Sequence, residues 1–95
     1  MNNQVPELKP KILKVLKCHG IKKAGIFGSY ARGEQKRTSD VDILVQTPEE
    51  MSLFGFVGVK RELEEILHKK VDLVEYDTIR PALRERILKE EVKIL

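Results

Sequence analysis

Residues 40 to 45, Asp-Val-Asp-Ile-Leu-Val, alternate in a pattern that a β-strand separates onto two faces. The two valines and the isoleucine share one face, whereas Asp40, Asp42 and Leu44 share the other. We expect the valine face to contact the core. The chain must therefore fold around a strand whose outer face presents two carboxylates.

Helices and strands are predicted to alternate along the whole chain. Leu8, Ile12 and Leu16 recur at helical spacing, and residues 71 to 76 have a strand-like composition around Asp72. The order predicts one domain over residues 1–95 of the α/β or α+β class, with helices packed against a small mixed sheet. The predicted elements are helices over 6–18, 30–34 and 47 to about 68, strands over 24–27, 40–45, 71–76 and 92–95, and a last helix capped by Asp77 or Thr78.

The helix after the central strand is predicted to open with a capping box. Thr47 supplies the capping hydroxyl, Pro48 suits the first helical position, and Glu50 occupies the third. This pattern places the start of the helix immediately after the strand.

Composition narrows the class of protein. The chain has 95 residues, 41% hydrophobic and 35% charged, which suits one domain with a thin core. Its single cysteine, Cys18, excludes an intrachain disulfide and favours a reducing, cytoplasmic compartment. With no signal-peptide core and no apolar run of about 18 residues, no membrane span is expected. The net charge of +3 favours anionic ligands such as triphosphates but does not by itself predict nucleic-acid binding.

Gly28 and Ser29 follow the first predicted strand and precede a helical turn. Such a turn exposes backbone N–H groups and one hydroxyl at the positive end of a helix, which suits phosphate oxygens. Taken alone, the pair also fits an ordinary tight turn.

Asp40 and Asp42 lie two residues apart on a strand, so their carboxylates point the same way and repel each other. Two hard oxygen ligands with room for water and phosphate suit Mg²⁺. Asp72 adds a third carboxylate in a strand, where aspartate is disfavoured. An isolated Asp-x-Asp would equally fit a solvated outer face.

Arg32 and Arg37 lie between the turn and the carboxylate strand. Either guanidinium could reach triphosphate oxygens or remain a solvated surface charge, and Glu34 is expected to pair with one of them. Tyr30 and Tyr76 fit half-buried packing better than stacking on a nucleotide base.

Together these residues resemble the DNA polymerase β-like nucleotidyltransferase superfamily, whose signature is Gly-Ser, a spacer of about ten residues, and Asp-x-Asp. Here Gly28-Ser29 is followed by residues 30 to 39 and Asp40-Val41-Asp42, and the later strand aspartate corresponds to Asp72. The sequence FGSYARGE…SDVDILV is similar to the minimal nucleotidyltransferases, catalytic cores that often accompany a small helical protein of the HEPN type. The resemblance covers residues 10 to 90.

The resemblance implies transfer of AMP from ATP to a hydroxyl acceptor, and it favours a tyrosine of a HEPN toxin as that acceptor. The chain would then be the antitoxin of a type VII-like toxin–antitoxin pair. Gly28 and Ser29 would hold the phosphates, Asp40 and Asp42 would bind two Mg²⁺ ions, and Asp72 would share one ion and serve as the base.

Two alternatives stay open on the sequence. A binding module could neutralise or scaffold a partner without turnover, but such a module has no need of three mutually repelling carboxylates. A nucleic-acid-modifying core would need a substrate domain that 95 residues do not contain. The acceptor, the base preference and the oligomeric state are not determined by the sequence.

Overall fold

The computed structural model describes residues 4–95 and confirms the predicted alternation of helices and strands. No helix in this part of the chain is long and apolar enough to cross a membrane. In chain order the elements are α1 (Val5–Cys18), β1 (Lys23–Phe27), α2 (Gly28–Arg32), β2 (Val41–Gln46), α3 (Leu53–Leu67), β3 (Val71–Glu75), the 3-10 turn η1 (Tyr76–Thr78), α4 (Pro81–Glu90) and β4 (Val92–Lys93).

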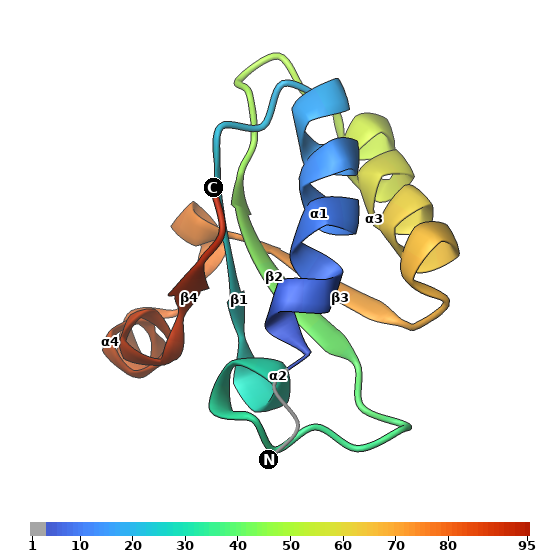
Figure 1. Ribbon diagram of the computed structural model, residues 1–95. Helices are drawn as coiled ribbons and strands as arrows, with labels where there is room; N and C mark the ends of the chain where they lie inside the picture. The colour runs from blue at the N-terminus through green and yellow to red at the C-terminus, as the bar shows by residue number, and fades with distance from the viewer. Residues whose placement is uncertain (1–3) are drawn as a thin grey trace.

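The four strands form one mixed sheet in the order β3-β2-β1-β4. β1 pairs antiparallel with β2 and β4, whereas β2 and β3 run parallel. The parallel strands are joined by α3, because such a pair requires a crossover connection. Figure 1 shows α1 and α3 side by side, with α4 apart from them beyond β1 and β4. The predicted mixed sheet is therefore confirmed, with β3 and β4 at its edges.

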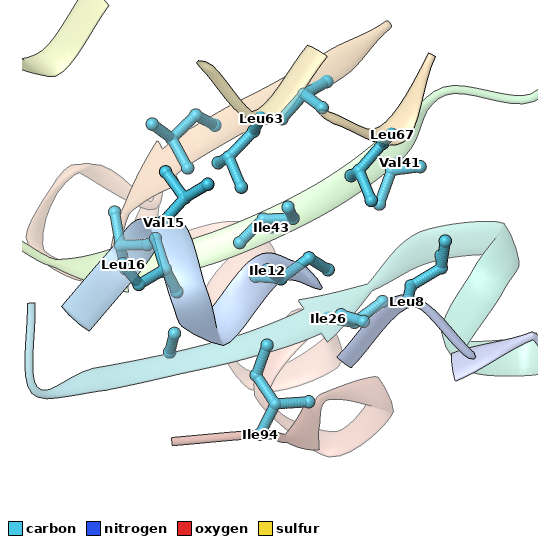
Figure 2. Packing of buried hydrophobic residues seen from close by; sticks show 14 of the residues in the cluster. Leu8, Ile12, Val15, Leu16, Ile26, Val41, Ile43, Leu63, Leu67 and Ile94 are labelled. Atoms are coloured by element: carbon cyan, nitrogen blue, oxygen red, sulfur yellow. The ribbon is translucent and has the colours of Figure 1, made fainter. Parts of the chain in front are cut away.

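α1 and α3 cover one face of the sheet and form most of the apolar core. Ile12 and Leu16 of α1, Leu63 of α3 and Ile43 of β2 belong to one cluster and are completely buried. Figure 2 shows these side chains converging between the helices and the strands. Each such burial contributes about 1.5 to 3 kcal/mol. The predicted core face of β2 is confirmed, and its packing fixes the strand that carries Asp42.

The opposite face of the sheet, which carries Asp42 and Leu44 and was predicted to be the outer face, is only partly exposed to solvent. Leu44 is fully buried there in a second cluster with Tyr76 and Ile79, and Ile87 of α4 packs against them. Among its described residues α4 buries none completely, and its Leu83 is 46% exposed. This helix therefore covers one end of the face and leaves the other end open.

Glu91 fastens the end of α4 to the sheet. The Tyr76 hydroxyl donates a hydrogen bond to the Glu91 carboxylate, and the Lys23 ammonium lies 4.5 Å from the centre of the Tyr76 ring. Burial, reinforced by Glu91, raises the pKa of Tyr76 above its ordinary value, which keeps this donor protonated. Gly25 leaves the space that Glu91 occupies, since a Cβ there would overlap the carboxylate. Tyr76 is thus buried more deeply than the predicted half-buried packing.

The predicted capping box at the start of α3 is wrong. Ser52 is the N-cap, and its hydroxyl accepts a 3.1 Å hydrogen bond from the Gly55 N–H. Thr47 instead donates from its backbone N–H and its hydroxyl to the Glu75 carboxylate, at 2.9 and 2.6 Å. The hydrogen bonds from Thr47 to Glu75 of β3 therefore form in place of the predicted cap.

The last helix also begins later than predicted. Asp77 and Thr78 lie in η1, and α4 starts at Pro81 with Arg80 as an N-cap that makes no side-chain hydrogen bond. Proline suits this first helical position because it has no N–H to leave unsatisfied. The predicted edge strand over 92–95 is confirmed in position but shortened to β4.

α2 begins at Gly28, two residues before the predicted helical turn, and Tyr30 anchors it in the core. The Tyr30 side chain is only 1% exposed, so the prediction of half-buried packing understates its burial. Its hydroxyl has no hydrogen-bond partner among residues 4–95. A buried hydroxyl without a partner lowers stability, whereas the ring contributes apolar burial.

We predict that Tyr30→Phe leaves the free energy of unfolding unchanged or raises it by up to about 1 kcal/mol, because only the unsatisfied hydroxyl is lost. Tyr30→Ala should lower it by about 3 to 5 kcal/mol, since it also removes the ring. Urea unfolding of the three proteins would test both values. A clear loss of stability in Tyr30→Phe would mean that the hydroxyl has a stabilising partner.

Candidate active site

One row of residues crosses three strands at the open end of the sheet. In the strand register, Phe27 of β1 is opposite Asp42 of β2, and Asp42 is opposite Asp72 of β3. Neighbouring strands lie about 4.8 Å apart, so this register brings the two carboxylates together. Gly28 and Ser29 follow Phe27 directly and open α2. The register therefore places the glycine-serine turn and two strand aspartates at one location.

Two features require glycine at position 28: its backbone conformation and the closeness of the Asp42 side chain. Its φ of +73° lies in the left-handed region, which favours glycine. A Cβ at this position would overlap the Asp42 carboxylate, so the turn and the carboxylate are in direct contact. Ser29 is half-buried beside it, and no side chain caps the amino end of α2. Backbone N–H groups at such an end suit anionic oxygens.

The three predicted aspartates differ in burial. Asp42 is half-buried, whereas Asp40, just before β2, and Asp72 are exposed. Burial is the largest cause that raises the pKa of Asp42 to about 6, followed by the negative charges of Asp72 and Asp40, with Arg32 acting in the opposite direction. The structure therefore brings Asp40 and Asp72 within electrostatic reach of Asp42.

The donor set suits a hard divalent cation. Within residues 4–95, no group of three or more His, Cys, Asp or Glu side chains is arranged closely enough to hold a metal ion by itself. Asp42 and Asp72 nevertheless supply oxygen ligands in mutual repulsion, which a cation relieves. Mg²⁺ commonly takes one or two protein carboxylates and completes its shell with water and substrate phosphate. The residues present therefore fit Mg²⁺ bound together with a nucleotide.

Arg32 is hydrogen-bonded to two carboxylates. Its Nε donates to Glu34 and its Nη1 donates to Glu90 of α4, each at 2.9 Å. The predicted pairing of Glu34 with an arginine is confirmed. Glu90 was not singled out by the sequence, because it lies 58 residues further along the chain. Arg32 thus links α2 to α4 while remaining close enough to Asp42 to influence its charge.

Arg37 lies exposed in the loop between α2 and β2. The Lys69 ammonium is 3.4 Å from its backbone carbonyl oxygen, and the same ammonium lies 6.0 Å from the centre of the Tyr30 ring. These contacts bring the loop next to the start of β3. The contact from Lys69 holds the backbone of Arg37. Binding of phosphate by the Arg37 guanidinium stays a prediction.

Comparison with known proteins identifies the family to which this sequence is similar. A profile of the family described as polymerase beta, nucleotidyltransferase matches residues 10–95. MJ0435 of Methanocaldococcus jannaschii, named as a protein adenylyltransferase, is 54% identical over 91 residues, covering 96% of this chain and 98% of its own. The protein adenylyltransferase MntA of Thermococcus cleftensis is 41% identical over 75 residues, covering 79% of this chain and 76% of its own.

A solved structure of a toxin–antitoxin complex with AMP-PNP is similar in fold. It has a TM-score of 0.80 and 26% sequence identity, and the match covers 92% of this chain and 72% of the other. The mixed sheet with helices is therefore the fold of a nucleotidyltransferase core, as the sequence predicted.

Two glycines with the same backbone conformation allow the Asp42 contact to be tested. Gly28 and Gly33 have φ values of +73° and +71°, but a Cβ at Gly33 would have nothing within 4 Å. We predict that Gly33→Ala lowers the free energy of unfolding by about 1 to 2 kcal/mol through backbone strain alone. Gly28→Ala should cost about 1 to 3 kcal/mol more, because Asp42 must move. Equal losses in urea unfolding would show that Asp42 does not press on Gly28.

Asp42 should destabilise the metal-free protein at neutral pH. Its pKa of about 6 in the fold exceeds the ordinary value, so stability is present at low pH and is lost as the pH rises from about 4 to above 6. In EDTA at pH 7.5, Asp42→Asn should raise the free energy of unfolding by about 1 to 2 kcal/mol, after allowance for solvent screening. The gain should vanish near pH 4. A lower melting temperature for the variant at pH 7.5 would contradict the repulsion.

Proposed function

This chain belongs to the polymerase β nucleotidyltransferase family, and we propose that it transfers AMP from ATP to a hydroxyl of a partner protein. The observation that carries the proposal is the row in which Asp42 contacts Gly28 on one side and faces Asp72 on the other. This row brings together backbone N–H groups that suit an anion and carboxylates that suit a metal ion. The names of the relatives and the AMP-PNP complex support the same reaction class.

Two Mg²⁺ ions would be held by Asp40, Asp42 and Asp72. When bound, they neutralise phosphate charge and lower the pKa of the acceptor hydroxyl. The negative charges that repel one another in the metal-free protein supply the attraction for these ions. The site is thus matched to a metal–triphosphate complex rather than to a neutral ligand.

The chain's own residues would bind and orient the substrate. Ser29 and the backbone N–H groups at the start of α2 bind the terminal phosphate oxygens, which places the α-phosphorus over the row of aspartates. The acceptor oxygen forms a bond to this phosphorus, the bond from the α-phosphorus to the bridging oxygen breaks, and pyrophosphate leaves. Asp72 receives the proton of the acceptor hydroxyl on its carboxylate.

The arginines would act on the leaving group. Arg37 is exposed on the loop that precedes Asp40, and no carboxylate within residues 4–95 forms an ion pair with it, so its guanidinium would be available to the triphosphate. Arg32 would have to exchange its bond with Glu90 for one with a phosphate oxygen. Arg37 therefore needs less rearrangement than Arg32 to serve as a phosphate ligand.

The acceptor would be a partner protein, as the names of the relatives, protein adenylyltransferases, suggest. The resemblance to minimal nucleotidyltransferases points to a HEPN-type toxin and to a tyrosine on it, which makes this chain an antitoxin. Docking of that partner turns a bimolecular attack into a positioned one. The isolated chain should accordingly bind Mg-ATP and transfer slowly.

We predict that Asp72→Asn stops transfer to the partner without weakening the complex. The cognate HEPN-like protein is incubated with the chain, ATP and Mg²⁺, and its intact mass is measured. Wild type should add the mass of AMP, whereas Asp72→Asn should reduce the rate by at least about a hundredfold, because proton acceptance and a metal ligand are both lost.

Complex formation is followed in parallel by size-exclusion chromatography. Asp77→Asn, which lies on the 3-10 turn beyond β3, is the matched control and should transfer at the wild-type rate. Equal neutralisation of the partner by wild type and Asp72→Asn, with no added mass in either, would favour the binding module over the enzyme.

A further inference from the structure

β3 is an edge strand, and its outer side belongs to no ladder formed by residues 4–95. The Val41 N–H donates to the Lys70 carbonyl at 2.9 Å, so the main-chain groups of residue 70 face β2. Main-chain groups alternate in direction along a strand, which turns those of residues 71, 73 and 75 outward. The Val71 N–H confirms this direction, since it donates to the Glu64 carboxylate at 3.1 Å and not to β2.

Leu73 therefore presents its N–H and its carbonyl along the outer edge. Glu75 presents only its N–H there, because its carbonyl already accepts a 2.9 Å hydrogen bond from the Thr78 hydroxyl. An edge that no strand of residues 4–95 pairs with is a template for a further strand. The edge begins beside Asp72, whose side chain lies on the open face of the sheet. A strand added here would run directly alongside the candidate active site.

An apolar hollow of about 350 Å³ adjoins this edge on the helix-covered face. Its walls include Leu53 and Phe56 from the first turn of α3 and Leu73 and Val74 from β3. Leu53 is 79% exposed and the neighbouring Phe54 is 90% exposed, which is unusual for large apolar side chains at adjacent positions. The edge and the hollow together have the form of a peptide-binding site.

We propose that the outer edge of β3 binds an extended segment of the acceptor protein as an added strand, and that this segment delivers its hydroxyl to Asp72. The proposal rests on the proposed function for the acceptor's chemistry. The segment residue opposite Asp72 projects onto the open face, because opposite residues on neighbouring strands share a face. The adjacent segment residue projects to the other face, into the hollow. The recognised pattern is thus a hydroxyl residue next to a large apolar residue.

The charges at the two ends of the edge favour a peptide of mixed charge. Lys69 and Lys70 precede β3, and Glu75 lies at its end. A segment with an acidic residue at one end and a basic residue at the other complements them. A nucleic acid would place phosphates against Glu75 in a hollow that no lysine or arginine lines.

A second copy of the chain is a poorer occupant of the same edge. In antiparallel self-pairing centred on Leu73, Glu75 of the second copy would lie opposite Val71. Its carboxylate would then approach Glu64, which already accepts from the Val71 N–H. Like charges opposed across two strands are destabilising.

Binding is tested without ATP, so that the result is independent of transfer. The probe is a fluorescent peptide of about seven residues, a usual strand length, with a central Tyr flanked by Leu and with Glu and Lys at opposite ends. Its reversed sequence reports the strand direction. The matched peptide carries N-methyl groups on the alternate residues that would bond to the edge, and it should bind at least about tenfold more weakly.

Leu53→Ser should weaken binding of the peptide by about five- to tenfold, because the apolar contact in the hollow is lost. Leu83→Ser, at an exposed leucine of α4, is the matched control and should leave binding unchanged. Amide hydrogen exchange at Leu73 and Glu75 should slow when the peptide is bound.

Several results would overturn the proposal: no binding of either peptide order at millimolar concentration, equal binding of the N-methylated peptide, or unaltered exchange at Leu73 and Glu75 in the bound state. Slow exchange of these amides together with dimerisation in the absence of peptide would assign the edge to a second copy instead. Failure of AMP transfer with intact peptide binding would count against the proposed function alone.

Discussion

The strand register that sets Phe27 opposite Asp42, and Asp42 opposite Asp72, is the constraint on which the candidate site depends. It forces two carboxylates onto neighbouring strands and brings Gly28 against one of them. Burial and mutual repulsion raise the pKa of Asp42 to about 6, so the arrangement lowers stability when no cation is bound. Such local instability is expected at functional sites, where residues are placed for chemistry at a cost in stability.

One face of the sheet carries most of the apolar core, and the other carries the charged residues of the candidate site. α1 and α3 bury the apolar face almost completely, which allows the other face to carry charge. α4 covers only part of that second face and is held by Glu91 on Tyr76 and by Glu90 on Arg32. Asp40 and Asp72 remain exposed beside this partly covered face.

The fold and the site were predictable to different extents from the sequence. The aspartates and the glycine-serine turn were found because strand alternation and turn chemistry are local signals. The cap at Thr47 was wrong because Glu75, 28 residues away, binds that threonine. The link from Arg32 to Glu90 had no local signal, since the two residues meet only when α4 folds back over the sheet. Local patterns thus identified the candidate site residues, and tertiary pairing decided which polar side chains were already hydrogen-bonded elsewhere.

The fate of the individual phosphates tests the central claim most directly. The wild-type chain and the HEPN-like protein proposed as its partner are incubated with Mg²⁺ and with ATP labelled on either the α- or the γ-phosphate. Nucleotidyl transfer predicts that the α label becomes attached to protein and that the γ label leaves in pyrophosphate. Attachment of the γ label to protein, or of neither label, would contradict the account.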